Sequence, residues 1–345
     1  MTLLQEYATY REIKSQTEAW AQGIHAWDEV EYPEAAGKYE QVIFTGCGST
    51  YYLALAAAAL YQELTGYGAR AVPGGELLLN PQAAVGQIGN LSYNYLLVAI
   101  SRSGTTTETV KAVEKFKADH HGEVVVISNY DEMLSRLADV NIVIPKGQEE
   151  SVAQTRSFAS LYVAATAFCA RMAGRNDLVE RMSTLPEIGE RLMLDFEPAA
   201  RQMGENLAFD RFYFLGSGIR YGLACEVSLK MKEMTLTHSE PFHFLEFRHG
   251  PMSMVNEKAV VVGLVSESNF SHEKAVLDEM QALGGRIVAL GESGVDIAFE
   301  SGIPESARGV LYLPVLQLMA FHRSLAKGLN PDRPNNLSTV IKLDL

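Results

Sequence analysis

The chain has 345 residues, of which 47% are hydrophobic and 21% charged, and its formal net charge at pH 7 is -13. This composition excludes a disordered chain, and the length favours two domains over one. Lys and Arg form no visible cluster, so we expect no nucleic-acid partner. The sequence contains neither a run of 18 uncharged apolar residues nor an N-terminal targeting pattern, which predicts a cytoplasmic protein without a membrane partner.

The first forty residues include the helical pattern YATYREIKSQTEAW and predict an N-terminal helical arm, residues 1–40. The chain then repeats itself, since QVIFTGCGSTYYLA at 41–54 resembles RFYFLGSGIRYGLA at 211–224. Each copy is an apolar run, a Gly-x-Gly turn and an Ala-rich helical segment, which is the strand–loop–helix unit of a parallel sheet. Further buried strands are expected at 96–101, 123–128, 141–144, 259–265, 286–290 and 309–314.

This pattern predicts an α/β protein with two tandem domains, residues 41–185 and 186–345, each holding an open and mainly parallel sheet. Neither Gly-x-Gly turn carries the third glycine of a dinucleotide fingerprint, so we expect no nicotinamide cofactor. The three cysteines, Cys47, Cys169 and Cys225, have no metal-binding spacing, and we expect no metal. Ligands of such sheets bind at the carboxyl ends of the strands, where we expect the functional motifs to meet.

One such strand end is unusually rich in hydroxyl groups. Residues 96–108 read LLVAISRSGTTTE, so a buried strand passes through Ser101, Ser103 and Gly104 into a helix. Backbone N–H groups at a helix start, with hydroxyls beside them, bind anions, and a phosphate is the expected ligand. The alternative is ordinary helix capping, for which one hydroxyl suffices.

A second polar segment, EESVAQTRSF at 149–158, follows the strand NIVI. Glu149, Gln154, Thr155 and Arg156 have side chains suited to sugar hydroxyls. The alternative is a polar loop that caps the next helix. The sequence leaves both interpretations open.

The densest group of reactive side chains lies at 221–254, YGLACEVSLKMKEMTLTHSEPFHFLEFRHGPMSM. Glu226, Lys230 and Glu233 are spaced to share one helical face. Such a stripe is commonly a solvated row of ion pairs, but its apolar neighbours favour the lining of a cavity. The turn EFRHGP adds Glu246, Arg248 and His249, and His249 has the titration range for moving protons.

Together, the motifs GCGST, SRSGTT, SVAQTRSF, LKMKE and EFRHGP resemble the sugar isomerase (SIS) family, specifically the isomerase half of glucosamine-6-phosphate synthase and stand-alone SIS-type glucosamine-6-phosphate deaminases. The resemblance implies two flavodoxin-like SIS subdomains, a homodimer with composite active sites, a hexose or hexosamine phosphate as ligand, and no cofactor. By motif, it implies phosphate binding by Ser101, Arg102, Ser103 and Thr106, and sugar binding by Ser49, Thr50, Val152 and Gln154. Glu233 matches the base that moves a proton between C1 and C2, and His249 matches the ring-opening histidine, which the partner subunit supplies; Lys230 completes the predicted catalytic group.

Two features differ from the synthases. Synthases begin with a glutaminase domain that has an N-terminal cysteine, whereas this sequence begins MTLL, so we expect no ammonia from glutamine. The family's tail carries a lysine that forms a Schiff base, and Thr339 stands at the matching position, with Lys342 three residues on. In an extended tail an odd offset points a side chain to the opposite face, which disfavours Lys342 as a substitute.

The function expected from the sequence is an aldose–ketose isomerase and deaminase that converts a glucosamine-6-phosphate-like substrate to fructose 6-phosphate and ammonia. One alternative is deglycation of a fructosamine 6-phosphate, which needs the same base and a larger pocket. The other is a non-catalytic sugar-phosphate sensor. A sensor needs no base, so the presence of both Glu233 and His249 favours an enzyme.

Overall fold

The structure of the protein is a computed structural model, and it describes residues 3–28, 30, 36–86, 94–120 and 122–339. The chain folds into two compact units. The β1–β5 unit comprises Glu18–Glu149, Arg156–Ser183 and Ser338–Leu345. The β6–β10 unit comprises Met1–Thr17, Glu150–Thr155 and Thr184–Leu337. The domain boundaries given above at residues 40 and 185 stay predictions.

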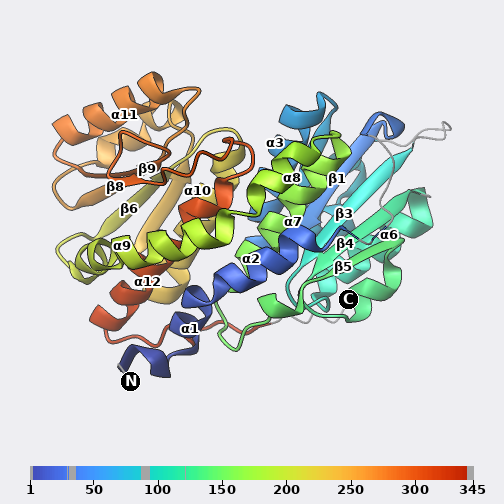
Figure 1. The fold of residues 1–345 in the computed structure, drawn as a ribbon, viewed down its shortest axis with the longest axis horizontal. Coiled ribbons are helices and arrows are strands. Elements are labelled where there is room, and N and C mark those ends of the chain that lie inside the picture. Colours follow the sequence, from blue (N-terminus) through green and yellow to red (C-terminus); the bar gives the residue numbers. More distant parts are fainter. Residues whose placement is uncertain (1–2, 29, 31–35, 87–93, 121, 340–345) are drawn as a thin grey trace. The chain divides into compact units, whose positions relative to one another are not determined.

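The first unit contains a parallel five-stranded sheet in the order β2-β1-β3-β4-β5 (Figure 1). Its strands are β1 (Gln41–Gly46), β2 (Ala69–Pro73), β3 (Tyr95–Ser101), β4 (Glu123–Ser128) and β5 (Val140–Val143). This is the flavodoxin-like order, in which the chain changes direction across the sheet between β1 and β3. Because Thr45 pairs with Ala99, the Gly-x-Gly turn after β1 and the hydroxyl-rich loop after β3 leave the same edge of the sheet.

The second unit repeats this topology, with the order β10-β9-β8-β6-β7. Its strands are β6 (Arg211–Leu215), β7 (His238–Phe242), β8 (Ala259–Leu264), β9 (Arg286–Gly291) and β10 (Ile297–Ala298). The predicted fold class, α/β with two tandem flavodoxin-like domains, is confirmed. One predicted strand is wrong: residues 309–314 form a 3-10 turn, Gly309–Tyr312, that leads into a helix. Pro314 at the helix start fits this assignment, because its missing N–H would have no partner there.

Helices cover both faces of each sheet (Figure 1). They are α1 (Ala8–Lys14), α2 (Gln16–His25), α3 (Ser49–Thr65), α4 (Gly74–Leu79), α5 (Pro81–Val85), α6 (Thr107–His120), α7 (Arg156–Met172), α8 (Asn176–Met182), α9 (Leu185–Glu205), α10 (Ile219–Thr235), α11 (Phe270–Ala282) and α12 (Leu313–Ala326).

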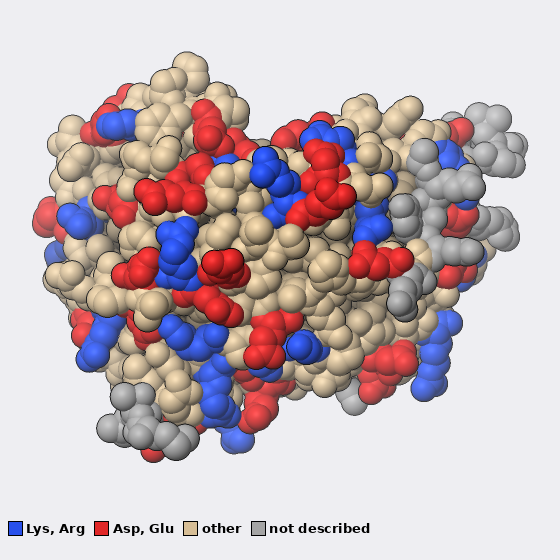
Figure 2. Space-filling model, in the orientation of Figure 1, with Lys and Arg blue, Asp and Glu red and all other residues tan. Residues whose placement is uncertain are grey.

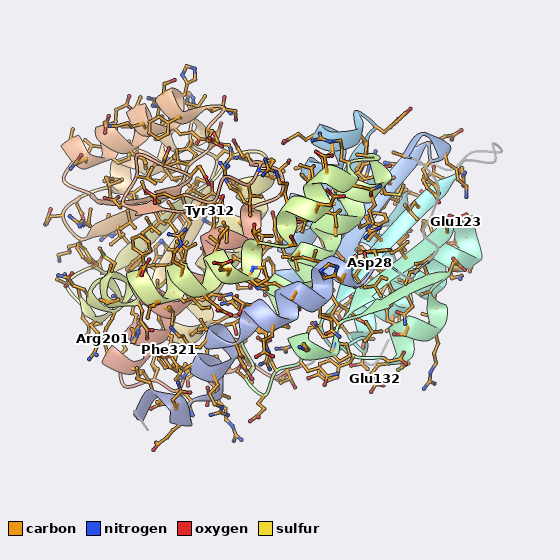
Figure 3. All side chains as sticks on the ribbon, viewed as in Figure 1. Asp28, Glu123, Glu132, Arg201, Tyr312 and Phe321 are labelled. Carbon is orange, nitrogen blue, oxygen red and sulfur yellow. The ribbon has the colours of Figure 1, made fainter. Side chains whose placement is uncertain are left out.

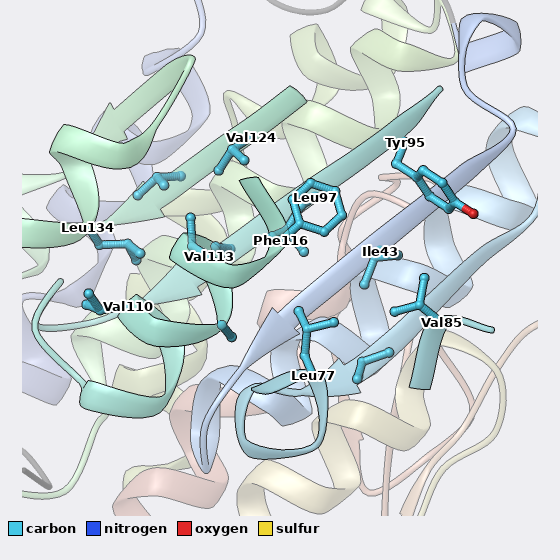
Figure 4. Close-up of a cluster of buried hydrophobic side chains, with 14 residues drawn as sticks. Ile43, Leu77, Val85, Tyr95, Leu97, Val110, Val113, Phe116, Val124 and Leu134 are labelled. Atoms are coloured by element: carbon cyan, nitrogen blue, oxygen red, sulfur yellow. The ribbon is translucent and has the colours of Figure 1, made fainter. Parts of the chain in front are cut away.

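The core of the β1–β5 unit shows why the strands are apolar throughout. Ile43 packs with Leu97, Val124 and the α6 side chain Phe116 in one buried cluster (Figure 4). The next residue, Phe44, points to the opposite face and meets the rings of Tyr61 on α3 and Phe168 on α7. A sheet buried on both faces therefore cannot alternate apolar and polar residues.

The two Gly-x-Gly turns have the same local geometry. Gly48 has φ 58 and ψ -124, and Gly218 has φ 57 and ψ -131, a region that favours glycine. A Cβ on Gly46 would lie 2.6 Å from Thr50 Oγ1, and one on Gly216 would lie 2.5 Å from the Arg220 carbonyl oxygen. Each turn therefore needs one glycine for its backbone angle and one for the close approach of strand and helix.

On the face shown in Figure 2, Lys and Arg side chains are interspersed with Asp and Glu. Within the described ranges, none of the helices is both long enough and apolar enough to span a bilayer.

Candidate active site

Two carbonyl groups of the loop after β3 accept hydrogen bonds from other residues of the unit. Gly104 accepts a hydrogen bond from the amide of Leu134 at 2.9 Å, and Arg102 accepts one from the amide of Asn129 at 3.2 Å. The hydroxyl of Ser101 accepts from the Gly104 amide at 3.1 Å, which closes the turn. Over the described residues, the amides of Ser103 and Thr106 have no acceptor. These donors at the start of α6 are available to an anion.

Position 104 requires glycine because of both its backbone angle and the atoms around it. Its φ of 67 lies in the left-handed region. A Cβ there would lie 3.1 Å from the Cβ of Glu132, a residue labelled in Figure 3, and 3.2 Å from the Tyr130 carbonyl oxygen. A side chain at this position would therefore displace the loop.

The side chain of Arg102 is bonded to other residues of the same unit. Its guanidinium lies 3.7 Å from the carboxylate of Glu149, with the two side chains 9% and 0% exposed. It also donates a 2.8 Å hydrogen bond to the carbonyl of Thr339, so this tail residue lies at the start of the loop. Arg102 thus links the loop, the segment before α7 and the tail. Lys342 lies outside the described residues.

The predicted sugar-binding pair after β1 is buried. The hydroxyl of Thr50 donates to the carbonyl of Cys47 and accepts from its amide, both at 3.0 Å, so it stabilises the turn. Ser49 is buried at the first position of α3. Burial raises the pKa of the Cys47 thiol, which also contacts the Thr109 hydroxyl at 3.4 Å, and the thiol form is favoured.

Residues 150–155 belong to the other unit and are held by its first and last segments. The carboxylate of Glu12 accepts from the amide of Glu150 at 2.6 Å and from the Ser151 hydroxyl. The Val152 amide donates to the carbonyl of Asp332 at 3.0 Å. Gln154 presents a buried amide oxygen that has no hydrogen-bond partner in the part of the chain that the structure describes. Such an oxygen is costly unless a ligand or water donates to it.

The carboxylate stripe lies on α10 of the same unit. The Lys230 ammonium lies 2.6 Å from Glu233 Oε2 and 3.4 Å from Glu226 Oε1. Lys230 and Glu226 are each 1% exposed, whereas Glu233 is 19% exposed. The stripe is therefore not a solvated row of ion pairs. One buried ammonium serves two carboxylates, and only Glu233 reaches the surface of the unit.

His249 is exposed, in the turn between two 3-10 segments, Glu246–Arg248 and Pro251–Met254. Arg248 forms a two-bond ion pair with Glu279 on α11, at 2.7 and 2.6 Å, which fixes the base of this turn. A second histidine, His243, stacks on Tyr221 with ring centroids 3.9 Å apart. Partial burial lowers the pKa of His243, and Glu246 partly offsets this.

The fold and both groups of residues agree with one protein family. The model of the SIS domain matches residues 38–171 and 209–321, which cover both sheets. The chain belongs to the SIS domain family.

This SIS chain is similar to several enzymes whose names describe sugar-phosphate substrates. The isomerizing glutamine–fructose-6-phosphate aminotransferase of Pyrococcus horikoshii is 29% identical over 98% of this chain and 58% of its own length. The solved structure of glucosamine-6-phosphate deaminase from Thermotoga maritima is 25% identical, with a TM-score of 0.80 over 97% of this chain and 100% of that one. Tagatose-6-phosphate ketose/aldose isomerase from Escherichia coli has the same fold, with 21% identity and a TM-score of 0.78 over 96% of each chain. The chain spans a little over half the length of the curated relatives it matches.

Sequence patterns missed the residues that hold the SIS motifs in place. Glu12 and Asp332 support the 150–155 loop from positions far away in sequence. The sequence suggests Glu149 as a sugar ligand, whereas in the structure its carboxylate pairs with Arg102 and accepts from Ser157. A single buried charge carries no periodic signal, so only the fold shows its partner.

Proposed function

We propose that this SIS chain is an aldose–ketose isomerase and deaminase that converts a hexosamine 6-phosphate to a ketose 6-phosphate and ammonia. The observation that carries the proposal is Glu233, a carboxylate that is held by a buried lysine and is itself partly exposed. The loop with two available amides supports phosphate binding. The deaminase from Thermotoga maritima, similar over its whole length, supports the reaction type.

The proposed reaction starts with opening of the sugar ring, assisted by His249. Glu233 takes the proton from C2 and returns it to C1, while the C1 oxygen becomes a hydroxyl by gaining the proton that the C2 amine loses. The C2–N bond becomes an imine, and water then replaces nitrogen with oxygen and releases ammonia. The phosphate does not react, and its binding orients the carbons in front of the base.

Polar groups around the sugar are assigned by what each can donate or accept. Ser103 and Thr106 offer backbone N–H groups to the phosphate, and the Gln154 oxygen accepts from a sugar hydroxyl. Arg102, with its guanidinium bound to Glu149 and Thr339, positions the loop and the tail in this scheme. Lys230 holds the base, because its ammonium hydrogen-bonds Glu233 at 2.6 Å.

His249 acts in a homodimer in this proposal, with each site completed by the partner's copy. Its exposure on the surface of the β6–β10 unit is compatible with such a role. Two-fold pairing would make both sites composite and identical.

Binding of glucosamine 6-phosphate is expected to weaken about tenfold or more in Gly104→Ala, because the new Cβ pushes the loop away from Glu132 and Tyr130. The matched control is Gly66→Ala, in the same unit. Gly66 has φ 74 and no atom within 4 Å of an added Cβ, so it carries the same backbone penalty without moving the loop. Calorimetric titration of wild type and both variants, with glucosamine 6-phosphate and unphosphorylated glucosamine, measures the effect.

Equal affinities of the wild type for glucosamine with and without phosphate would contradict phosphate recognition. Equal losses in Gly104→Ala and Gly66→Ala would attribute the effect to backbone strain instead of the loop. Tight binding without any turnover would favour the sensor.

A further inference from the structure

The loop after β8 has the same construction as the phosphate loop after β3. Ser266 Oγ accepts from the amide of Asn269 at 3.0 Å, just as Ser101 Oγ accepts from the amide of Gly104 at 3.1 Å. Both loops follow the strand at the point where the chain changes direction across its sheet, and both lead into a helix. The Tyr312 hydroxyl, labelled in Figure 3, donates to the carbonyl of Val265 at 2.6 Å and fixes the strand end. Topology alone would therefore give each half of the chain an anion site.

The second loop differs because its donors already have anionic partners. The Glu273 carboxylate accepts from the amide of Ser266 at 2.6 Å and from its hydroxyl at 3.0 Å. The Glu305 carboxylate accepts from the amides of Glu267 at 3.1 Å and Ser268 at 3.4 Å. In the first loop, the amide of Ser103, which corresponds to Ser268, has no acceptor over the described residues.

A buried arginine pairs with both carboxylates. Arg220, 4% exposed, lies 3.3 Å from Glu273 and hydrogen-bonds Glu305. With the 170-residue offset of the internal repeat, Arg220 corresponds to Thr50 in the first half. At this position the first half thus has a small hydroxyl, and the second half has a cation that pairs with two internal carboxylates.

We propose that the loop Ser266–Asn269, with Arg220, is a second anion site of the SIS pair whose ligand is the chain's own Glu305 carboxylate. The site is closed to sugar phosphates in the native chain, and loss of the Glu305 side chain opens it to a small carboxylate such as acetate or formate. Glu273 remains beside Arg220 after this change, so a singly charged anion fits better than a phosphate dianion.

The test is anion rescue of Glu305→Ala, followed by thermal unfolding of the full chain. Its melting temperature is expected to fall by about 5 °C or more, because buried Arg220 and two amides lose a partly buried partner. Sodium acetate is expected to restore roughly half of the loss in a saturable way, whereas sodium chloride at equal ionic strength is not. Wild type and Glu300→Ala, which removes an exposed carboxylate from the same segment, should respond equally to the two salts.

An equal response of Glu305→Ala to acetate and chloride would overturn the proposal, and so would an unchanged melting temperature without added anion. If the variant does not fold alone, recovery on refolding in acetate but not in chloride supports the proposal, and recovery in neither rejects it. Because the readout is stability, the result does not depend on the enzymatic activity proposed above.

Discussion

Glu233→Gln is expected to lower kcat for ammonia release from glucosamine 6-phosphate by about 10²–10⁴-fold, with little change in substrate affinity. The amide keeps the shape of the side chain but cannot take the C2 proton. Its oxygen can still accept the hydrogen bond that Lys230 makes to Glu233, and Glu226 remains as the buried partner of Lys230. The variant should therefore fold normally. Steady-state kinetics, together with calorimetric binding, separates the loss of turnover from a loss of affinity.

The matched control is Lys232→Gln, an exposed neighbour on the same helix, which should keep kcat close to the wild-type value. Near wild-type turnover by Glu233→Gln would show that another group is the base. A large loss of binding would assign Glu233 to ligand recognition instead.

Mixed subunits test whether each active site combines Glu233 of one subunit with His249 of its partner. Glu233→Gln and His249→Ala are each expected to be inactive, and random exchange of equal amounts should restore about a quarter of the normal number of sites. Half of the dimers are mixed, and one of the two sites in each mixed dimer receives both wild-type side chains. Activity is measured after subunit exchange at equal total protein concentration.

Mixing either variant with Lys232→Gln controls for exchange itself. If the double mixture stays inactive while subunit exchange is demonstrated by tagged chains, His249 acts within its own chain or has no part in the reaction. A monomeric protein with full activity would reject the composite site directly.

The long buried strands were predictable because burial on both faces leaves a continuous apolar run, as in β3 and β8. The edge strands β2 and β7 were not, because their residues are only partly buried and include Pro73 and Pro241. Proline is tolerated at a sheet edge, yet in a sequence it indicates a break. The strand prediction for residues 309–314 was wrong for the opposite reason. This segment is buried on all sides, and its composition does not separate strand from helix.

The candidate site was predictable where its chemistry lies in contiguous motifs. The hydroxyls of 101–107 and the spacing of Glu226, Lys230 and Glu233 are both visible in the sequence. The motif does not encode burial, so it does not show that two carboxylates share Lys230. The occupied second loop depends on Arg220, Glu273 and Glu305, which only the fold brings together.

The most direct test of the account is the product balance of the wild-type chain. Incubation with glucosamine 6-phosphate is expected to release ammonia and fructose 6-phosphate in equal amounts, with no ammonia from unphosphorylated glucosamine. Parallel incubation with fructosamine 6-phosphates and separate assays for each product identify the preferred nitrogen substituent. Amine release from fructosamine 6-phosphates alone, or binding of glucosamine 6-phosphate with no product at all, would contradict the proposed deaminase.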